Sequence, residues 1–440
     1  MPLHSTPSIA YPFTVLSWAL VVTLAIGFGN RCMSYYQTGS SSPEAVSNAA
    51  DTIPANPEPR WWKGNLHTHS LWSDGNDFPE MISDWYRVRG YNFLAISDHN
   101  VLQEGQRWMA VSAVRSRSGD RALDAYVHRF GDRWVETRGE NGTPNYEVRL
   151  KPLDEYRYLM EQRGQFILIP AEEITDKAEG KPVHMNATNL DHVIKPLGGA
   201  TVRQAMESNL RAVLEQEKTL GREILPHLNH PNFGYGITFE DLAAVMAERF
   251  FEVYNGHPGV NHLGDASHPG VERMWDLANH LRVNKLGGSL LMGVATDDSH
   301  EYFGKPGSHP GRGWVVVRAA FLTPEHLIRA MKAGDFYCSS GVTLSDVRWH
   351  AEQKTLHVTI DPQEGAKYTT EYIVTHRSGE VDKIGRVAHT TEAMTSSYTL
   401  QGDETFVRAV VTSNKTPEDP VFENQKQQAW TQPFMASESP

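Results

Sequence analysis

Short apolar runs that each end in polar side chains recur along the middle of this chain, and they constrain its fold more than any other feature. Near-continuous apolar runs bounded by turn residues are typical of strands buried on both faces, as in a parallel sheet. The runs are FLAISDHN (93–100), FILIPAEEIT (166–175), EILPHLNHP (223–231), FFEVYNGH (250–257) and LLMGVATDDSH (290–300).

Helix-like segments lie between these runs. TFEDLAAVMAERF (238–250) and TPEHLIRAMKAG (323–334) both open on a threonine followed closely by carboxylates, which is a helix-start signature. Alternating strands and helices predict an α/β fold. Polar groups at the ends of five or more strands favour a (β/α) barrel, whose active sites gather at the C-terminal face. An open doubly wound sheet is the alternative, but it usually places its ligands at one switch point.

The rest of the chain divides into segments of different character. Residues 61–341 hold the barrel pattern, and residues 342–440 alternate polar and apolar residues without a long helical pattern, which predicts a small, sandwich-like antiparallel β domain and a tail. Residues 38–60 are rich in Ser, Pro, Ala and Asn and predict a flexible linker.

The first 37 residues predict a membrane-targeting segment. Its core, Ser8–Gly29, has no charged side chain, so it is either a signal peptide or an uncleaved anchor. We therefore expect an exported protein, periplasmic or otherwise extracytoplasmic, attached to the membrane through this segment if it is not cleaved.

Composition excludes several classes of function. The formal net charge is −12 and no basic run is present, which argues against nucleic-acid binding. Cys32 and Cys338 are the only cysteines, so a bound metal ion must be held by His, Asp and Glu side chains. The sequence contains neither a glycine-rich phosphate loop ending in Lys–Ser/Thr nor a Ser-centred nucleophile elbow.

Histidine and carboxylate side chains collect at the predicted strand ends. A single histidine is more often structural than a ligand, but side chains two apart share a face, and two such pairs recur together with further strand-end residues. An ion usually takes three or four protein ligands, so this set requires two or three ions. The candidate ligands are His67, His69, Asp74, His99, Glu173, His184, His230, Asp298 and His300.

The motifs HTHSLWSDG, ISDHN, PAEEIT, VHMNATNL, LNHP and TDDSH occur in that order between about Trp61 and Gly341. This set resembles the PHP (polymerase and histidinol phosphatase) family of metal-dependent phosphoesterases, and more loosely its exported, carbaryl-hydrolase-type members. The resemblance implies a distorted (β/α)7 barrel with a trinuclear site. It implies one ion on His67, His69, Glu173 and Asp298, a second on Glu173, His184 and His230, and a third on Asp74, His99 and His300.

We therefore expect a metal-dependent hydrolase, most simply a phosphoesterase in which a metal-bridging hydroxide attacks phosphorus directly. The ions would be two or three of zinc, manganese or iron, and the substrate a small phosphorylated ester. Hydrolysis of a carboxyl ester or carbamate by the same site is one alternative, and a non-catalytic, metal-dependent envelope binding protein is another. Catalysis is expected to depend on Glu173, Asp298 and His300.

Several further residues have open roles. Asp98 orients a ligand ring or caps a loop, Arg312 contacts a substrate phosphate or is a solvated loop residue, and His257 protonates the leaving group or is structural. Glu172 and Asp297 stand beside ligands where the family often has uncharged residues. The long segment 100–172 is an insertion that forms either a lid over the site or a helical elaboration.

Overall fold

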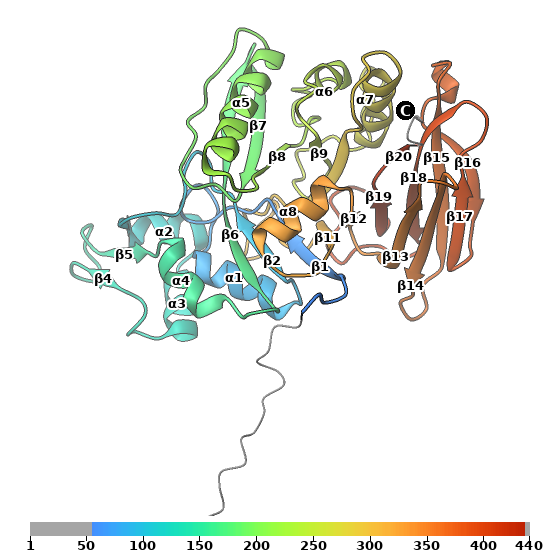
Figure 1. Ribbon diagram of the computed structural model, residues 1–440. Coiled ribbons are helices and arrows are strands. Elements are labelled where there is room, and N and C mark those ends of the chain that lie inside the picture. Colours follow the sequence, from blue (N-terminus) through green and yellow to red (C-terminus); the bar gives the residue numbers. More distant parts are fainter. Residues whose placement is uncertain (1–54, 436–440) are drawn as a thin grey trace, which may run out of the picture. The chain divides into compact units, whose positions relative to one another are not determined.

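The computed structural model describes residues 55–435, which form one compact unit of mixed α/β structure (Figure 1). The α/β class expected from the sequence is therefore confirmed. The predicted targeting segment and most of the predicted linker lie outside the described residues. Within residues 55–435, no helix has the length and hydropathy needed to cross a membrane. The helices are α1 (Pro79–Val88), α2 (Val111–Ser118), α3 (Ala122–Phe130), α4 (Leu153–Met160), α5 (Val202–Leu220), α6 (Phe239–Ala244), α7 (Val271–Asn284), α8 (Pro324–Lys332) and the 3-10 turn η2 (Val381–Lys383).

One long sheet carries most of the strands. The five apolar runs supply β2, β6, β8, β9 and β10 of this sheet, as predicted, and β20 (Phe434–Met435) pairs beside β18. In spatial order the strands are β10 (Met292–Thr296), β9 (Phe250–Asn255), β8 (Leu225–Leu228), β7 (Lys181–Thr188), β6 (Ile167–Ala178), β2 (Phe93–Ile96), β1 (Arg60–Asn65), β11 (Trp314–Ala319), β12 (Phe336–Ser339), β19 (Gln428–Thr431), β18 (Glu404–Ser413), β15 (Tyr368–His376) and β16 (Arg386–Thr391).

Strand direction brings the candidate ligands to one edge. Strands β1, β2 and β6 are mutually parallel, and so are β8, β9 and β10. Strand β7 is antiparallel to both β6 and β8, so the two groups run the same way. The carboxyl ends of all these parallel strands therefore meet at one rim, where loops and strand ends can converge.

The closed barrel is not confirmed, because the ladder of hydrogen-bonded strands stays open between β10 and β11. The free edge of β10 is covered instead by side chains. The Gln432 amide donates to the carbonyl of Gly293 and accepts from its N–H, both at 2.9 Å, and the Cys338 thiol donates to the same carbonyl at 3.0 Å. At the rim, however, Thr68 and Ser299 form a parallel bridge that joins the segments following β1 and β10.

The sequence signatures of the helices hold locally. Thr323 caps α8 by accepting from the N–H of His326 at 3.3 Å. Thr238 and Asp241 form a reciprocal capping box at the start of α6. The helix predicted over 238–250 is nevertheless shorter than expected. It ends at Ala244, because β9 already begins at Phe250 and the chain must turn back to the sheet.

The insertion, residues 100–172, folds mainly as a separate small layer. It contains α2, α3 and α4 and a three-stranded sheet in the order β3 (Arg107–Ala110), β5 (Glu147–Leu150), β4 (Thr137–Arg138). Figure 1 shows α2, α3, β4 and β5 at the left, at the far end of the described residues from the C-terminal strands at the right. Its own apolar core includes Val114, Tyr126 and Val148, so it is a folded elaboration.

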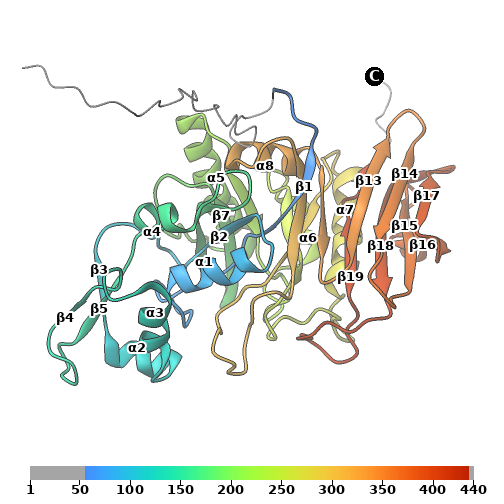
Figure 2. The same ribbon diagram turned by 90° about the horizontal axis from the view of Figure 1, so that it is seen from below.

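The C-terminal strands continue the principal sheet. Strand β19 pairs with both β12 and β18, so hydrogen bonding crosses the predicted boundary at residue 341. A second sheet, β13 (Thr343–His350), β14 (Thr355–Asp361) and β17 (Thr395–Thr399), packs its apolar side chains with those of β15 and β18, and Figure 2 shows the two layers side by side. A separate C-terminal domain therefore stays a prediction.

Candidate metal centre

The structure brings all nine candidate ligands together at the rim of the parallel strands. They come from distant parts of the chain, and each is carried by a strand or by the segment directly after one. His67, His69 and Asp74 follow β1, His99 follows β2, Glu173 lies in β6, His184 lies in β7, His230 follows β8, and Asp298 and His300 follow β10.

The first group is fully buried and built around His67 and His69. The Nε2 atoms of these two rings are 3.1 Å apart. Oε2 of Glu173 lies 3.5 Å from His67 Nε2 and 3.3 Å from His69 Nε2. Oδ1 of Asp298 lies 3.2 Å from each of the same nitrogens. Four ligand atoms thus face one common point.

The second group uses the other oxygen of Glu173. Its Oε1 lies 2.9 Å from His184 Nδ1 and 3.6 Å from His230 Nε2. Oδ2 of Asp298 lies 4.0 Å from His230 Nε2. The two carboxylate oxygens of Glu173 therefore face two different sets of imidazoles, which is the arrangement of a bridging ligand.

The third group is the one nearest solvent. Asp74 places Oδ2 at 3.3 Å from His99 Nε2 and Oδ1 at 3.4 Å from His300 Nε2. His69 belongs to this group as well, because its Nδ1 lies 3.7 Å from Asp74 Oδ1 and its ring stacks on that of His300 at 4.0 Å. The Asp74 side chain is 56% exposed, whereas that of Glu173 is 1% exposed.

Backbone conformation at two ligands is unusual. Asp298 has a φ of 48° and His230 has a φ of 20°. Both values lie at positive φ, which residues other than glycine rarely adopt. Such residues cost about 1–3 kcal/mol each and cluster at functional sites. The surrounding fold therefore holds these two ligands in place against local backbone preference.

Glu173 provides the test of whether the site fits metal ions. Its Oε2 is buried and accepts no hydrogen bond from any described residue, although three imidazole nitrogens lie within 3.5 Å of it. A buried polar atom without a partner is costly. The imidazole and carboxylate donor set is one that zinc, manganese and iron accept. The cluster could therefore hold divalent ions.

The pKa shifts of the two buried carboxylates are consistent with a site for divalent ions. Burial by itself would raise the pKa of Glu173, yet neighbouring imidazoles, above all His99 and His184, hold that pKa well below its usual range. The pKa of Asp298 is lowered in the same way, chiefly by His67, against the effect of burial. Both carboxylates are therefore ionised at neutral pH and ready to neutralise cations.

Glu252 contacts two of the candidate ligands, and the sequence analysis missed it. It lies in β9, and its Oε1 accepts from Nδ1 of His67 at 2.7 Å while Oε2 accepts from the N–H of His230 at 2.7 Å. A carboxylate on the far nitrogen fixes the ring orientation of a ligand histidine. The signal was a lone glutamate inside the otherwise apolar run FFEVYN, whose six residues are all buried.

Asp98 caps a loop. Its carboxylate accepts from the backbone N–H of Ser70 at 2.8 Å and from the hydroxyls of Ser70 and Ser73 at 2.7 and 2.6 Å. It also accepts from the Gln103 amide at 2.7 Å. The carboxylate is thereby occupied within the loop that follows His69, and no hydrogen bond joins it to a ligand ring among the described residues.

The Arg312 guanidinium is hydrogen-bonded within the protein. Its guanidinium donates to both carboxylate oxygens of Asp419, at 2.8 and 3.0 Å, and to the carbonyls of Gly256 and Gly307, at 2.7 and 2.9 Å. Its last N–H faces Nδ1 of His309 at 3.2 Å. Four of the five guanidinium donors are thus bound to protein oxygens, and the fifth is turned toward the His309–Asp419 pair, so Arg312 does not present its fork to a substrate phosphate. The solvated-loop alternative does not describe it either, because Arg312 is buried.

His257 borders the third group. Its ring lies 5.9 Å from that of His300 and 5.5 Å from that of Phe233. The N–H of Gly259 donates to Nδ1 of His257 at 3.0 Å, so in the neutral ring the proton sits on Nε2. Burial is the main cause of a lowered pKa at His257, which favours this neutral form.

The two extra carboxylates beside the ligands point away from them. Glu172, on the opposite face of β6 from Glu173, accepts from the N–H of Ile194 at 2.6 Å. Asp297 accepts from the N–H groups of Gly311 and Gly313, at 2.8 and 2.7 Å, and from the Tyr86 hydroxyl, at 2.7 Å. Both carboxylates fix loops around the site.

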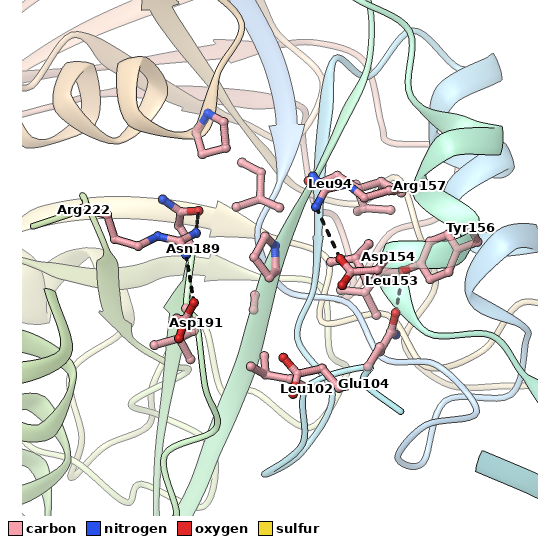
Figure 3. A pocket seen from close by; sticks show the side chains of 18 of the residues that line it. Leu94, Leu102, Glu104, Leu153, Asp154, Tyr156, Arg157, Asn189, Asp191 and Arg222 are labelled. Atoms are coloured by element: carbon pink, nitrogen blue, oxygen red, sulfur yellow. Dashed lines mark hydrogen bonds and ion pairs between the residues drawn. The ribbon is translucent and has the colours of Figure 1, made fainter. Parts of the chain in front are cut away.

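A cavity of about 320 Å³ lies elsewhere, beside the outer faces of β2 and β6 (Figure 3). Arg222 bonds there to Asn189 and lies 3.8 Å from Asp191, and Arg157 lies 3.9 Å from Asp154. The arginines are thus turned toward partners in the cavity wall. None of the nine candidate ligands lines this cavity.

Fold and site together define a mixed α/β protein with a buried histidine–carboxylate cluster that could hold divalent metal ions. No family model and no curated protein matches the chain. Among solved structures, it is similar to a two-domain protein from Bacteroides vulgatus containing a predicted PHP-like metal-dependent phosphoesterase, with 14% identity over 87% of this chain and 97% of that one, and a TM-score of 0.37.

Two further solved structures are similar at the same level. PsfC from Pseudomonas syringae has 14% identity over 62% of this chain and 88% of its own, with a TM-score of 0.33. A protein from Bifidobacterium adolescentis, described as a candidate metal-dependent phosphoesterase, has 15% identity over 57% and 92%, with a TM-score of 0.29. At these TM-scores the similarity does not define the family.

Proposed function

We propose that the chain is a metal-dependent hydrolase of phosphate esters with three divalent ions at the rim of a distorted (β/α)7 barrel of PHP type. One observation carries the proposal: the two oxygens of Glu173 face two separate sets of imidazoles, with Oε2 3.3 Å from His69 Nε2 and Oε1 2.9 Å from His184 Nδ1. A carboxylate shared in this way is what two neighbouring ions require.

Bound divalent ions would lower the pKa of water at the site and would polarise the ester oxygens. The side chains of the site would hold the ions in position and balance their positive charge. Glu173 and Asp298 are buried and ionised, so they balance cationic charge without needing to reorganise. Glu252 holds the ring of His67 in one orientation, so that its Nε2 faces the site.

His257 is the residue proposed to handle the leaving group. Its Nε2 carries the proton of the neutral ring, because Nδ1 accepts from the Gly259 N–H. The ring borders the solvent side of the site beside His300, where an ester could enter. A hydrogen bond donated by Nε2–H would then stabilise the negative charge that develops on the leaving oxygen as the ester bond breaks.

Hydrolysis of an aryl carboxyl ester or carbamate is the second candidate. Phe233 favours it, because its ring lies 5.1 Å from that of His230 and 5.5 Å from that of His257. This ring could pack against an apolar substituent of the substrate. A metal-dependent binding role without catalysis is the outcome left if neither ester is cleaved.

The proposed location is extracytoplasmic, and it rests on the uncharged run Ser8–Gly29 alone. We propose that residues 342–440 are a small β domain beside the catalytic region, with residues 38–60 as a tether. A fusion of residues 1–60 to an alkaline-phosphatase reporter should be active only after export. A fusion that remains in the cytoplasm and stays inactive contradicts the proposed location.

The decisive experiment measures metal content and hydrolysis on the same full-length preparation. Phosphomonoester and phosphodiester substrates of p-nitrophenol are compared with a naphthyl carbamate after loading with zinc or manganese. We expect phosphate-ester hydrolysis that Glu173→Gln abolishes together with metal binding. A preference for the carbamate by orders of magnitude selects the second candidate, and bound metal without any ester cleavage selects the binding role.

A further inference from the structure

We propose that Arg117, in the insertion, positions Asp74 and thereby determines how tightly the third ligand group binds a divalent ion. The inference rests on the proposed metal centre, and it gives the insertion a role that neither a lid nor a simple elaboration would have. Arg117 is not a candidate ligand, because a guanidinium is a cation without an acceptor atom, and its Nη1 donates to backbone carbonyls.

The third ligand group depends on a loop more than the other two groups do. Glu173 and His184 are held within strands, whereas Asp74 lies in the loop of residues 70–77, called here the Asp74 loop. Asp74 is the carboxylate that joins His99 and His300, and its side chain is 56% exposed. Any movement of this loop therefore changes the third group first.

Two arginines of the insertion hold the backbone of the Asp74 loop. Nη1 of Arg117 donates to the carbonyl of Ser73 at 2.6 Å and lies 3.4 Å from the carbonyl of Gly75, the residues on either side of Asp74. Nη1 of Arg107 donates to the carbonyl of Trp72 at 2.5 Å. Within residues 55–435, these three carbonyls accept from no backbone N–H.

The Asp74 loop also packs with the insertion as one apolar unit. Leu71 and Trp72 of the loop belong to the same buried cluster as Val111 and Val114 of α2. Arg117 lies on that helix, and its carbonyl accepts from Lys305 Nζ at 2.6 Å. The guanidinium is therefore presented to the loop from a fixed helix.

The loop is coupled tightly to a ligand of the buried group. A Cβ added at Gly75 would lie 2.3 Å from the carbonyl oxygen of His69, so the loop packs directly on the ligand backbone. The N–H of Asn76 donates to the carbonyl of His300 at 2.9 Å. Together with these contacts, the Arg117 hydrogen bonds fix the position of Asp74 relative to His69 and His300.

Loss of the Arg117 guanidinium would leave the Ser73 and Gly75 carbonyls without a protein donor. The loop could then move, and Asp74 with it, while Glu173 stays fixed within β6 and Asp298 is held just after β10 by the Asn255 amide at 3.1 Å. Residues that orient metal ligands typically change metal affinity by about 10–100-fold when removed. We expect the affinity for the third ion to fall by this factor and the affinity for the first two ions to stay unchanged.

The experiment uses the full chain and Mn²⁺ alone as the probe, with metal content measured after equilibration at graded concentrations of free Mn²⁺. The variants are Arg117→Ala, Arg117→Lys and Asp74→Asn. Arg115→Ala is the matched control, because Arg115 is exposed on the same helix and its side chain has no polar partner among the described residues. Thermal unfolding of each metal-free variant is measured in parallel.

We expect wild type and Arg115→Ala to bind three ions, and Asp74→Asn to bind two. Arg117→Ala should bind the third ion about 10–100-fold more weakly, with Arg117→Lys recovering part of that loss. The double variant Asp74→Asn/Arg117→Ala should lose no more than Asp74→Asn alone, because both act on the same ion.

Three results would overturn the inference. If Arg117→Ala binds three ions with wild-type affinity, the Asp74 loop does not need the Arg117 hydrogen bonds to hold its position. Equal weakening of all ions, with a lower unfolding temperature in both Arg117 variants, would show a general role in folding. A third ion absent from wild type would remove the premise. A wild-type chain that binds no Mn²⁺, zinc or iron would instead contradict the proposed function itself.

Discussion

Glu252 accepts a 2.7 Å hydrogen bond from Nδ1 of His67, a ring that lies 185 residues earlier in the chain. The opposite nitrogen of that ring, Nε2, faces Glu173 and Asp298. Thr296 adds a hydroxyl donor to the same carboxylate at 2.6 Å. Two buried elements, β9 and β10, therefore cooperate to aim one imidazole at the metal centre.

Glu252→Gln should weaken metal binding without removing a ligand. The amide can still face His67, but it cannot supply the charge that keeps the imidazole basic, so we expect metal affinity to fall about 10–100-fold. Glu248→Gln is the control, because Glu248 is a buried glutamate just before β9 that bonds only to the N–H groups of Arg249 and Phe250. Equal metal affinity in Glu252→Gln and wild type would contradict the orienting role.

Arg312→Ala should lower stability more than catalysis. The substitution leaves the carbonyls of Gly256 and Gly307 without their donor and leaves Asp419 with His309 alone, which should cost about 1–3 kcal/mol in the free energy of unfolding by urea. If stability is unchanged and KM for a phosphate ester rises instead, Arg312 contacts the substrate, which is one of the two roles that the sequence left open.

His257→Gln should slow hydrolysis in a way that depends on the leaving group. Loss of one hydrogen-bond donor to a developing oxyanion typically costs about 10²–10³-fold. The loss should be large for alkyl phosphates and small for p-nitrophenyl phosphate, whose leaving group delocalises its own charge. His262→Gln is the matched control, because the His262 ring is bound at 2.7 Å to the carbonyl of Asn255. Equal losses for both substrates would contradict the proposed role.

Glu248 should make the metal-free protein less stable as pH rises through the acid range. Burial is the main cause that raises its pKa from 4.5 to about 7 in the folded protein. The folded state therefore holds a proton that the unfolded state has released, and the stabilisation present below pH 4.5 is lost as pH rises to about 7.

The size of this effect is on the order of 3 kcal/mol, from 1.36 kcal/mol for each pKa unit. Urea unfolding at several pH values should show a decline in wild type that Glu248→Gln makes smaller, because burial also raises the pKa of Asp77 and of Glu172. An unchanged decline in the variant would assign the pH dependence to other groups.

Much of the strand pattern could be predicted from the sequence. The five apolar runs form β2, β6, β8, β9 and β10, because continuous burial leaves its mark in the chain as an unbroken apolar run. The nine candidate ligands could be found for a related reason. His, Asp and Glu at strand ends are expensive to gather unless something binds them, so their types and positions point to one shared site.

The antiparallel hairpin β6–β7 and the open edge of β10 were not visible in the sequence. Apolar runs look alike whichever way a strand runs, and Gln432, which covers Gly293 at 2.9 Å, lies far away in an unrelated segment. The shortened α6 has the same origin, since the chain must leave the helix after Ala244 to enter β9 at Phe250.

The sequence alone identified the candidate metal-binding residues and the strands at whose ends they lie. Only the tertiary structure decided what each one touches: that Glu252 serves His67, that Arg312 is bound by Asp419, and that Arg117 holds the Asp74 loop. Local pattern records burial and backbone shape, which depend on neighbours in the chain. Contacts between side chains depend on the paths of loops from distant segments, and no short-range pattern carries that information.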